Sequence, residues 1–155
     1  METVASLTGR FPHPGRVDWI GLRPARRAEL RAVDAADIEL SGLAGDHARP
    51  GKRAVTLIQA EHLPVIAALV GAGAIAPETL RRNIVVSDLN LIAARHRSLR
   101  VGSALLRITV PCAPCSRMEA ALGPGGYNAV RGHGGWCCEV VEPGRVALGD
   151  EVIPE

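Results

Sequence analysis

LLRITVP, residues 105–111, is the stretch of sequence that decides the fold most clearly. Its branched side chains are typical of a β-strand over residues 104–110, and Pro111 ends the strand because proline cannot donate a ladder hydrogen bond. Similar short apolar runs lie on both sides, separated by many of the 17 glycines and 11 prolines. We therefore predict further strands at residues 4–7, 17–22, 54–58, 83–86, 136–141, 145–147 and 151–153.

Helical patterns are fewer than strand patterns. Residues 63–70 place apolar side chains at helical spacing, which predicts a helix that begins near Glu61 and ends at Gly71. Residues 76–80 predict one short helical turn, and Ser116 followed by Glu119 predicts an N-cap for a helix over residues 116–122. Since strands dominate without regular βαβ alternation, we predict a mostly β, α+β fold, a largely antiparallel β-barrel with a few peripheral helices.

Length and composition limit the possible classes of function. The 155 residues predict one domain, residues 1–155, and 47% hydrophobic with 22% charged residues is typical of a globular chain. A net charge of +2 and only four aromatic residues (one Phe, one Tyr, two Trp) argue against a nucleic-acid partner.

Targeting and membrane signals are weak in this sequence. The N-terminal residues contain Glu2 and no continuous apolar run, and the longest nearly apolar run, residues 65–76, is short for a membrane span. We expect a cytoplasmic protein without a membrane partner. In that compartment four cysteines are expected as thiols or ligands rather than as a disulfide framework.

Two of these cysteines, Cys112 and Cys115, follow the decisive strand directly. A helix starting here would favour a thiolate, and Arg117 would add positive charge. Such a sulfur could act as a nucleophile, a persulfide carrier or a soft-metal ligand. Inert buried cysteines, a thioredoxin-like pair and structural zinc are the alternatives. The thioredoxin motif belongs in a βαβ setting that this region lacks. Zinc would need a second Cys-x-x-Cys, whereas Cys137 and Cys138 are adjacent and would point to opposite faces of a strand.

Three further stretches carry polar chemistry. Residues 123–135 contain six glycines, with Arg131 and His133 near their end, a pattern that suits a bound phosphate or else a mobile loop. In residues 80–86 two arginines and Asn83 lead into an apolar strand. Arginines hold phosphate bidentately and an amide can read a heterocycle edge, although an exposed charge pair is the simpler interpretation.

Residues 42–56 resemble the sequence of a phosphate-binding P-loop but do not have its spacing. Five residues separate Gly45 from Gly51 instead of four, and Arg53 stands where Ser or Thr should hold magnesium. Asp46 and His47 in this stretch could form an acid–base or ligand pair, or could simply form a turn.

Taken together and in this order, the motifs GLAGDH, KRAVTLIQAEHL, LRRNIVVSDLNL, LLRITVPCAPCSRME, GYNAVRGHGG and GRVALGDEV resemble the MOSC family. This family is named after the C-terminal domain of molybdenum cofactor sulfurases. The resemblance covers residues 17–152. It implies a β-barrel that binds the pterin form of the molybdenum cofactor, molybdopterin, and that is similar to small stand-alone bacterial members.

The resemblance also implies roles for particular residues. Cys115 matches the functional cysteine, which is the protein ligand to molybdenum in relatives similar to the amidoxime-reducing enzymes. The expected cofactor-binding residues are Arg53, Arg81, Arg82, Asn83, Asn128, Arg131 and His133. Two departures concern the anion pocket: Asp88 stands where the family usually has glycine, and Ala48-Arg49-Pro50 replaces a segment in which a second basic residue is common.

Three hypotheses follow. The first is a molybdenum-dependent oxidoreductase component for N-hydroxylated or related N–O small molecules, or else a cofactor handler, with Cys115 as catalytic residue and metal ligand. Because the chain has no flavin or iron–sulfur motif, a reductase would need a separate electron-donor protein. The second is a sulfur carrier with a Cys115 persulfide and no molybdenum, in which Cys112 is the resolving thiol. The third is a non-catalytic module that binds a phosphorylated ligand.

Overall fold

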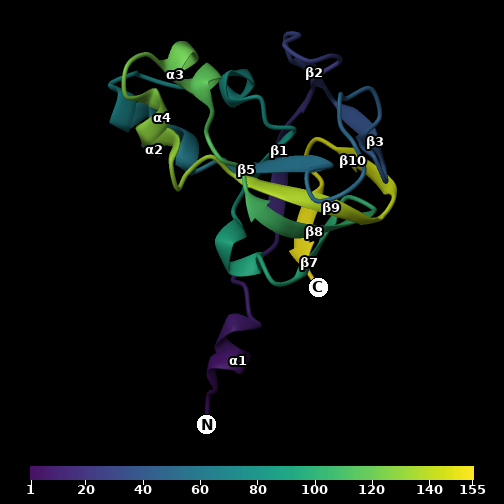
Figure 1. The fold of residues 1–155 in the computed structure, drawn as a ribbon. Coiled ribbons are helices and arrows are strands. Elements are labelled where there is room, and N and C mark those ends of the chain that lie inside the picture. The colour runs from purple at the N-terminus through teal and green to yellow at the C-terminus, as the bar shows by residue number, and fades with distance from the viewer.

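The computed structural model describes residues 1–155, and its centre is a closed β-barrel (Figure 1). Seven strands form the ring in the order β11-β7-β8-β9-β5-β6-β1, and the β11–β1 pair closes it. All neighbours are antiparallel except β5 and β6. The predicted barrel is therefore confirmed. The ring strands are β1 (Gly15–Leu22), β5 (Val55–Gln59), β6 (Ile84–Ser87), β7 (Ser98–Val101), β8 (Ala104–Pro111), β9 (Trp136–Glu142) and β11 (Glu151–Pro154).

Four further strands lie outside the ring. β2 (Arg31–Val33) extends β1, while β10 (Gly144–Ala147), β3 (Ala35–Glu39) and β4 (Gly42–Leu43) form a small separate sheet. The sequence did not predict β2, β3, β4 or β7. These strands have two to five residues and carry charged or small side chains, so their pairing depends on long-range partners that local pattern does not reveal.

Most helices gather at one end of the barrel (Figure 1). α2 (His62–Val70) and the 3₁₀ turn η1 (Pro77–Leu80) connect the parallel strands β5 and β6. The helix predicted here is confirmed, and it ends at Gly71 in the left-handed conformation (φ 73°). α3 (Ser116–Leu122) and α4 (Gly126–Val130) pack against each other beside it, and η2 (Leu91–Ala94) follows β6. No helix is long and apolar enough to cross a membrane.

The strand predicted at residues 4–7 is wrong, because these residues form the helix α1 (Val4–Thr8). Thr3 caps this helix, with its hydroxyl accepting a hydrogen bond from the backbone N–H of Ser6 at 3.0 Å. None of its residues is buried, and α1 projects away from the barrel (Figure 1). The branched residues therefore have no strand to pair with, and the local cap decides the conformation.

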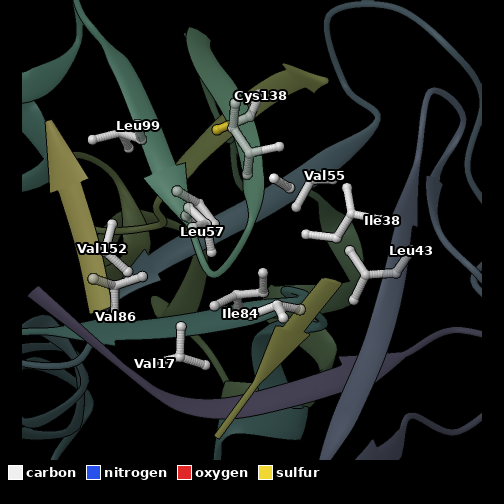
Figure 2. Packing of buried hydrophobic residues seen from close by; sticks show 14 of the residues in the cluster. Val17, Ile38, Leu43, Val55, Leu57, Ile84, Val86, Leu99, Cys138 and Val152 are labelled. Atoms are coloured by element: carbon white, nitrogen blue, oxygen red, sulfur yellow. The ribbon is translucent and has the colours of Figure 1, made fainter. Parts of the chain in front are cut away.

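Two apolar clusters hold the molecule together. The larger fills the barrel, with Val17, Leu57, Ile84 and Leu99 pointing inward, and Cys138 belongs to it (Figure 2). The smaller lies under the helices and contains Ile58, Ile66, Leu80, Val85, Met118 and Val130. Because consecutive strand residues point to opposite faces, β5 sends Leu57 into the barrel and Ile58 toward the helices. This second cluster fixes the helical end on which the candidate site is built.

Candidate functional site

Cys115 is the one exposed cysteine of the four. It lies four residues beyond the end of β8 and occupies the N-cap position of α3, with its carbonyl accepting a hydrogen bond from the Met118 N–H at 3.0 Å. The helix predicted over residues 116–122 is confirmed, but Ser116, expected as the cap, is its first helical residue. The cap position therefore presents a thiol to solvent.

Arg81 is the basic residue whose surroundings define the site. Burial lowers the pKa of its guanidinium, and the charges of Arg117 and Arg23 lower it further, whereas Asp46 and Cys115 act in the opposite direction. Charges act strongly only over short distances, so Arg81 lies near both the exposed thiol and Arg23. Its backbone is left-handed (φ 58°), a conformation that costs a residue with a Cβ about 1 kcal/mol.

The carboxylate of Asp46 holds Arg23 in place. The Asp46 side chain is fully buried. It accepts three hydrogen bonds from Arg23: from the backbone N–H at 2.6 Å, from Nε at 3.1 Å and from Nη2 at 2.8 Å. The carboxylate is therefore engaged within the protein. Its partner Arg23, in contrast, borders an open cavity.

That cavity has a volume of about 590 Å³ and a strongly basic lining. Its lining contains no acidic residue and consists of Arg23, Arg26, His47, Ala48, Arg49, Pro50, Lys52 and Arg53. Such a concentration of guanidinium groups is suited to phosphate. The altered segment Ala48-Arg49-Pro50 still supplies a basic side chain, Arg49, to this cavity.

Sequence reasoning singled out only Arg53 among the arginines of this cavity. The missed residues are Arg23, Arg26, Arg49 and Lys52. A signal for two of them was present, because Arg23 and Arg26 lie directly after the apolar strand β1, where charge is not needed for the core.

Asn83 is completely buried and is bonded by the protein at both ends of its amide. Its Oδ1 accepts hydrogen bonds from the N–H of Thr56 at 3.0 Å and from the Thr56 hydroxyl at 3.2 Å, while Nδ2 donates to the Gly21 carbonyl at 3.1 Å. The residue thus joins β1 and β5 at the start of β6. In this structure the amide predicted to read a heterocycle holds strands together.

Arg82 is buried with one nitrogen unsatisfied. Its Nε donates to the Gly134 carbonyl at 2.7 Å and its Nη1 to the Leu80 carbonyl at 3.1 Å, but Nη2 has no partner. No carboxylate contacts this guanidinium. A buried cation of this kind favours an anion nearby.

Within the glycine-rich stretch, residues 126–130 form the short helix α4, and turns flank it on both sides. The backbone N–H groups of Gly125 and Tyr127 donate to the Glu119 carboxylate, each at 2.9 Å, and these two bonds lower the pKa of Glu119. Part of the expected anion cradle is thus occupied by the protein's own carboxylate. Asn128 and Arg131 are exposed and lie 3.3 Å apart, Oδ1 to Nη1.

His133 and Asp88 contact other residues than Cys115. The ring of His133 stands edge-on to His62 at a centroid distance of 5.3 Å, and its Nδ1 is buried without a partner. Asp88 has a left-handed backbone (φ 68°), which explains why glycine would suit this position, and its N–H donates to the Glu61 carboxylate at 3.0 Å.

The remaining cysteines are buried and point in different directions. Cys138 lies in the barrel core, while Cys137 contacts Cys112, so the prediction that Cys137 and Cys138 face opposite sides is confirmed. No group of three or more His, Cys, Asp or Glu side chains is arranged to hold a metal ion by itself.

Comparison with known proteins agrees with this architecture. The family model of the MOSC domain matches residues 40–153. The chain belongs to the MOSC family. No functionally curated protein resembles it closely enough to be matched. This MOSC protein is similar in fold to the YuaD protein from Bacillus subtilis, with a TM-score of 0.78 and 19% identity over 90% of this chain and 94% of that one.

Two YiiM structures are also similar to this MOSC protein. YiiM from Escherichia coli gives a TM-score of 0.73 and 21% identity over 93% of this chain and 70% of that one. YiiM from Geobacillus stearothermophilus gives a TM-score of 0.75 and 16% identity over 92% of this chain and 75% of that one. At such identities the likeness establishes the barrel fold, and the family match places the chain in a family that is associated with the molybdenum cofactor.

Proposed function

We propose that this protein binds the pterin form of the molybdenum cofactor, with Cys115 as the protein ligand to molybdenum. We further propose that the loaded protein serves as the reductase component for N-hydroxylated or related N–O small molecules, receiving electrons from a separate donor protein. A role in passing the cofactor on would use the same site.

The observation that carries this proposal is the single exposed thiol near Arg81, together with the basic cavity bordered by Arg23, whose charge also acts on Arg81. The donor set fits the group. One thiol can complete the coordination of a soft metal that brings its other ligands with it, whereas no cluster here could bind a bare ion. When bound, the cofactor supplies two-electron oxo-transfer chemistry.

The chain's own residues would bind the cofactor and orient it. Arg23 and Arg53, with their guanidinium groups at the basic cavity, hold the phosphate tail, and Asp46 fixes Arg23 for this task. Arg81 has a left-handed backbone near Cys115 and Arg23, and its Nη1 donates to the Ala28 carbonyl. Asn83 acts as a positioning residue, because its side-chain amide is hydrogen-bonded to Thr56 and Gly21 within the protein.

The test of activity uses protein expressed in a host that makes the cofactor. Reduction of a hydroxylamine or amidoxime is measured with a chemical electron donor, and Cys115→Ser is compared with Cys138→Ser, a buried control. We expect turnover in the wild type and the control and its loss in Cys115→Ser. Cofactor-loaded protein that reduces no N–O compound with any donor would refute the reductase assignment.

A second candidate function rests on the same exposure of Cys115 to solvent. A persulfide at this position would make the protein a sulfur carrier without molybdenum. Intact-mass spectrometry distinguishes the two: a gain of one sulfur that a reductant removes supports the carrier, and a bare thiol opposes it. A module that only binds phosphorylated ligands predicts binding that survives Cys115→Ser but is lost on replacing Arg23 and Arg53.

A further inference from the structure

A second sulfur centre lies inside the protein, apart from Cys115. The Sγ atoms of Cys112 and Cys137 are 3.2 Å apart, and both residues are buried, at 8% and 5% exposure. Cys112 directly follows β8, and its N–H donates to the Gly135 carbonyl at 2.8 Å. Gly135 directly precedes β9, of which Cys137 is the second residue. The adjoining strands β8 and β9 therefore hold the two sulfurs in contact.

The charge around this pair favours a thiolate. Arg82 is buried beside it with Nη2 unpartnered, and none of its hydrogen bonds goes to a carboxylate. The charge of Arg82 acts on both thiols, and Arg53 and Arg23 also act on Cys137. The pair can thus neutralise a buried cation that otherwise has no counter-ion.

The proton of the pair is shared unequally. The hydrogen bond between the two sulfurs, with the nearby arginines, lowers the pKa of Cys137 to about 7. The same hydrogen bond, together with burial, raises the pKa of Cys112. One sulfur is therefore ready as a nucleophile while the other keeps its proton.

A cavity reaches this centre at Cys112. Cys112 lines a cavity of about 270 Å³ together with Gln59, His62, Asn90, Ile92, Pro111, Gly132, Gly134, Gly135 and Trp136. Hydrogen peroxide is about the size of two water molecules, so this cavity has room for it. The glycines in the lining carry no side chains that would fill the cavity.

We propose that Cys112 and Cys137 form a redox-active dithiol that hydrogen peroxide converts to a disulfide. The Cys137 thiolate attacks one peroxide oxygen, the O–O bond breaks, and hydroxide leaves and takes up a proton to become water. Cys137 is then a sulfenic acid. The Cys112 sulfur attacks it, the S–O bond breaks, and the thiol proton leaves with the hydroxyl group as a second water. Two thiols lose two electrons, and peroxide gains them.

This inference is independent of the cofactor proposal, because it uses neither Cys115 nor a bound group. It also changes the partner expected for Cys112. The sequence suggested that Cys112 resolves a persulfide on Cys115, whereas the contact in the structure is with Cys137.

The test is non-reducing peptide mapping of the full-length protein after graded peroxide treatment. We expect a peptide linked through Cys112 and Cys137, with a mass lower by two hydrogens, in the wild type and equally in the control Cys115→Ser. In Cys112→Ser, Cys137 should stop at the sulfenic acid and be captured by a dione probe. The wild-type map alone decides the matter if the variant does not fold.

Two results would overturn the proposal. One is a link from Cys112 to Cys115 instead of Cys137. The other is a pair of unmodified Cys112 and Cys137 thiols at peroxide concentrations that already oxidise the exposed Cys115.

Discussion

At the scale of single residues, Arg81 combines a strained backbone with a place at the site. Its φ is +58°, and it lies near Cys115 and Arg23. Non-glycine residues in left-handed conformations concentrate at functional sites, where surrounding structure maintains them. The chain offers a matched control, because Arg27 is also left-handed (φ 66°) but is exposed and does not line the basic cavity.

We predict that Arg81→Gly and Arg27→Gly both change the free energy of unfolding by less than about 1 kcal/mol, since relief of strain offsets the entropy of glycine. Only Arg81→Gly should lose cofactor, with pterin per protein falling roughly tenfold as a charged contact near Cys115 disappears. Denaturant titration and pterin fluorescence measure the two effects. Equal pterin content in both variants would remove Arg81 from the site.

The pKa shifts of the buried thiols give a pH dependence of stability. The pKa of Cys137 falls from 9.0 in the unfolded chain to about 7, so the unfolded state binds more protons between these values. This group therefore stabilises the fold fully above pH 9, and its contribution disappears as the pH falls through 7. Above pH 9 the raised pKa values of Cys112 and Cys138 act in the opposite direction.

We accordingly predict that, under reducing conditions, the free energy of unfolding of the wild type rises from pH 7 to pH 9 relative to Cys137→Ser. Urea denaturation at a series of pH values measures this difference. A difference that does not change with pH would show that Cys137 keeps an ordinary thiol.

At the scale of elements, Glu119 links α3 to α4. Its carboxylate accepts from the N–H groups of Gly125 and Tyr127, which lowers its pKa. A depressed carboxyl pKa contributes stability above about pH 4.5, and that stability is lost as the pH falls through the folded value.

We expect Glu119→Gln to speed hydrogen exchange at the Gly125 and Tyr127 amides without unfolding the barrel. The wild type should show the same loss of protection on acidification. Glu139→Gln, which alters an exposed ion pair with Arg107 on the barrel, is the control. Unchanged exchange at both amides would contradict the link.

The elements also show what local sequence decides. Strands rich in branched residues, such as β8 and β5, were predicted because their composition and breakers agree with their burial. α1 was predicted as a strand because apolar residues alone do not show whether a partner exists. The stretch at 123–135 was predicted to bind a phosphate or to be a mobile loop, since its glycines conceal that residues 126–130 can close a helical turn on Glu119.

At the scale of the whole molecule, β11 closes the barrel by pairing with both β1 and β7, whereas α1 buries nothing. We predict that removing residues 151–155 abolishes cooperative unfolding, because two strand edges lose their partner and Val152 leaves the core. Removing residues 1–9 should shift the melting temperature by only about one or two degrees. Calorimetry of both truncations measures this, and equal losses would refute the closure argument.

The site is a property of the whole molecule that the sequence predicted only in part. The order of the motifs indicated Cys115 and Arg81, and the structure places them near each other. The basic cavity could not be predicted in full, since Arg23 and Arg26 follow β1 while Arg49, Lys52 and Arg53 precede β5. The contact between Cys112 and Cys137 likewise depends on how β8 and β9 come together.

The most direct test of the central claim is the molybdenum and pterin content of protein expressed in a cofactor-producing host. Elemental analysis gives the metal, and fluorescence of the oxidised pterin gives the organic part. We predict stoichiometric molybdenum and pterin in the wild type and a loss of molybdenum in folded Cys115→Ser. Wild-type protein that carries neither, or a Cys115→Ser variant that keeps its full molybdenum content, would contradict the account.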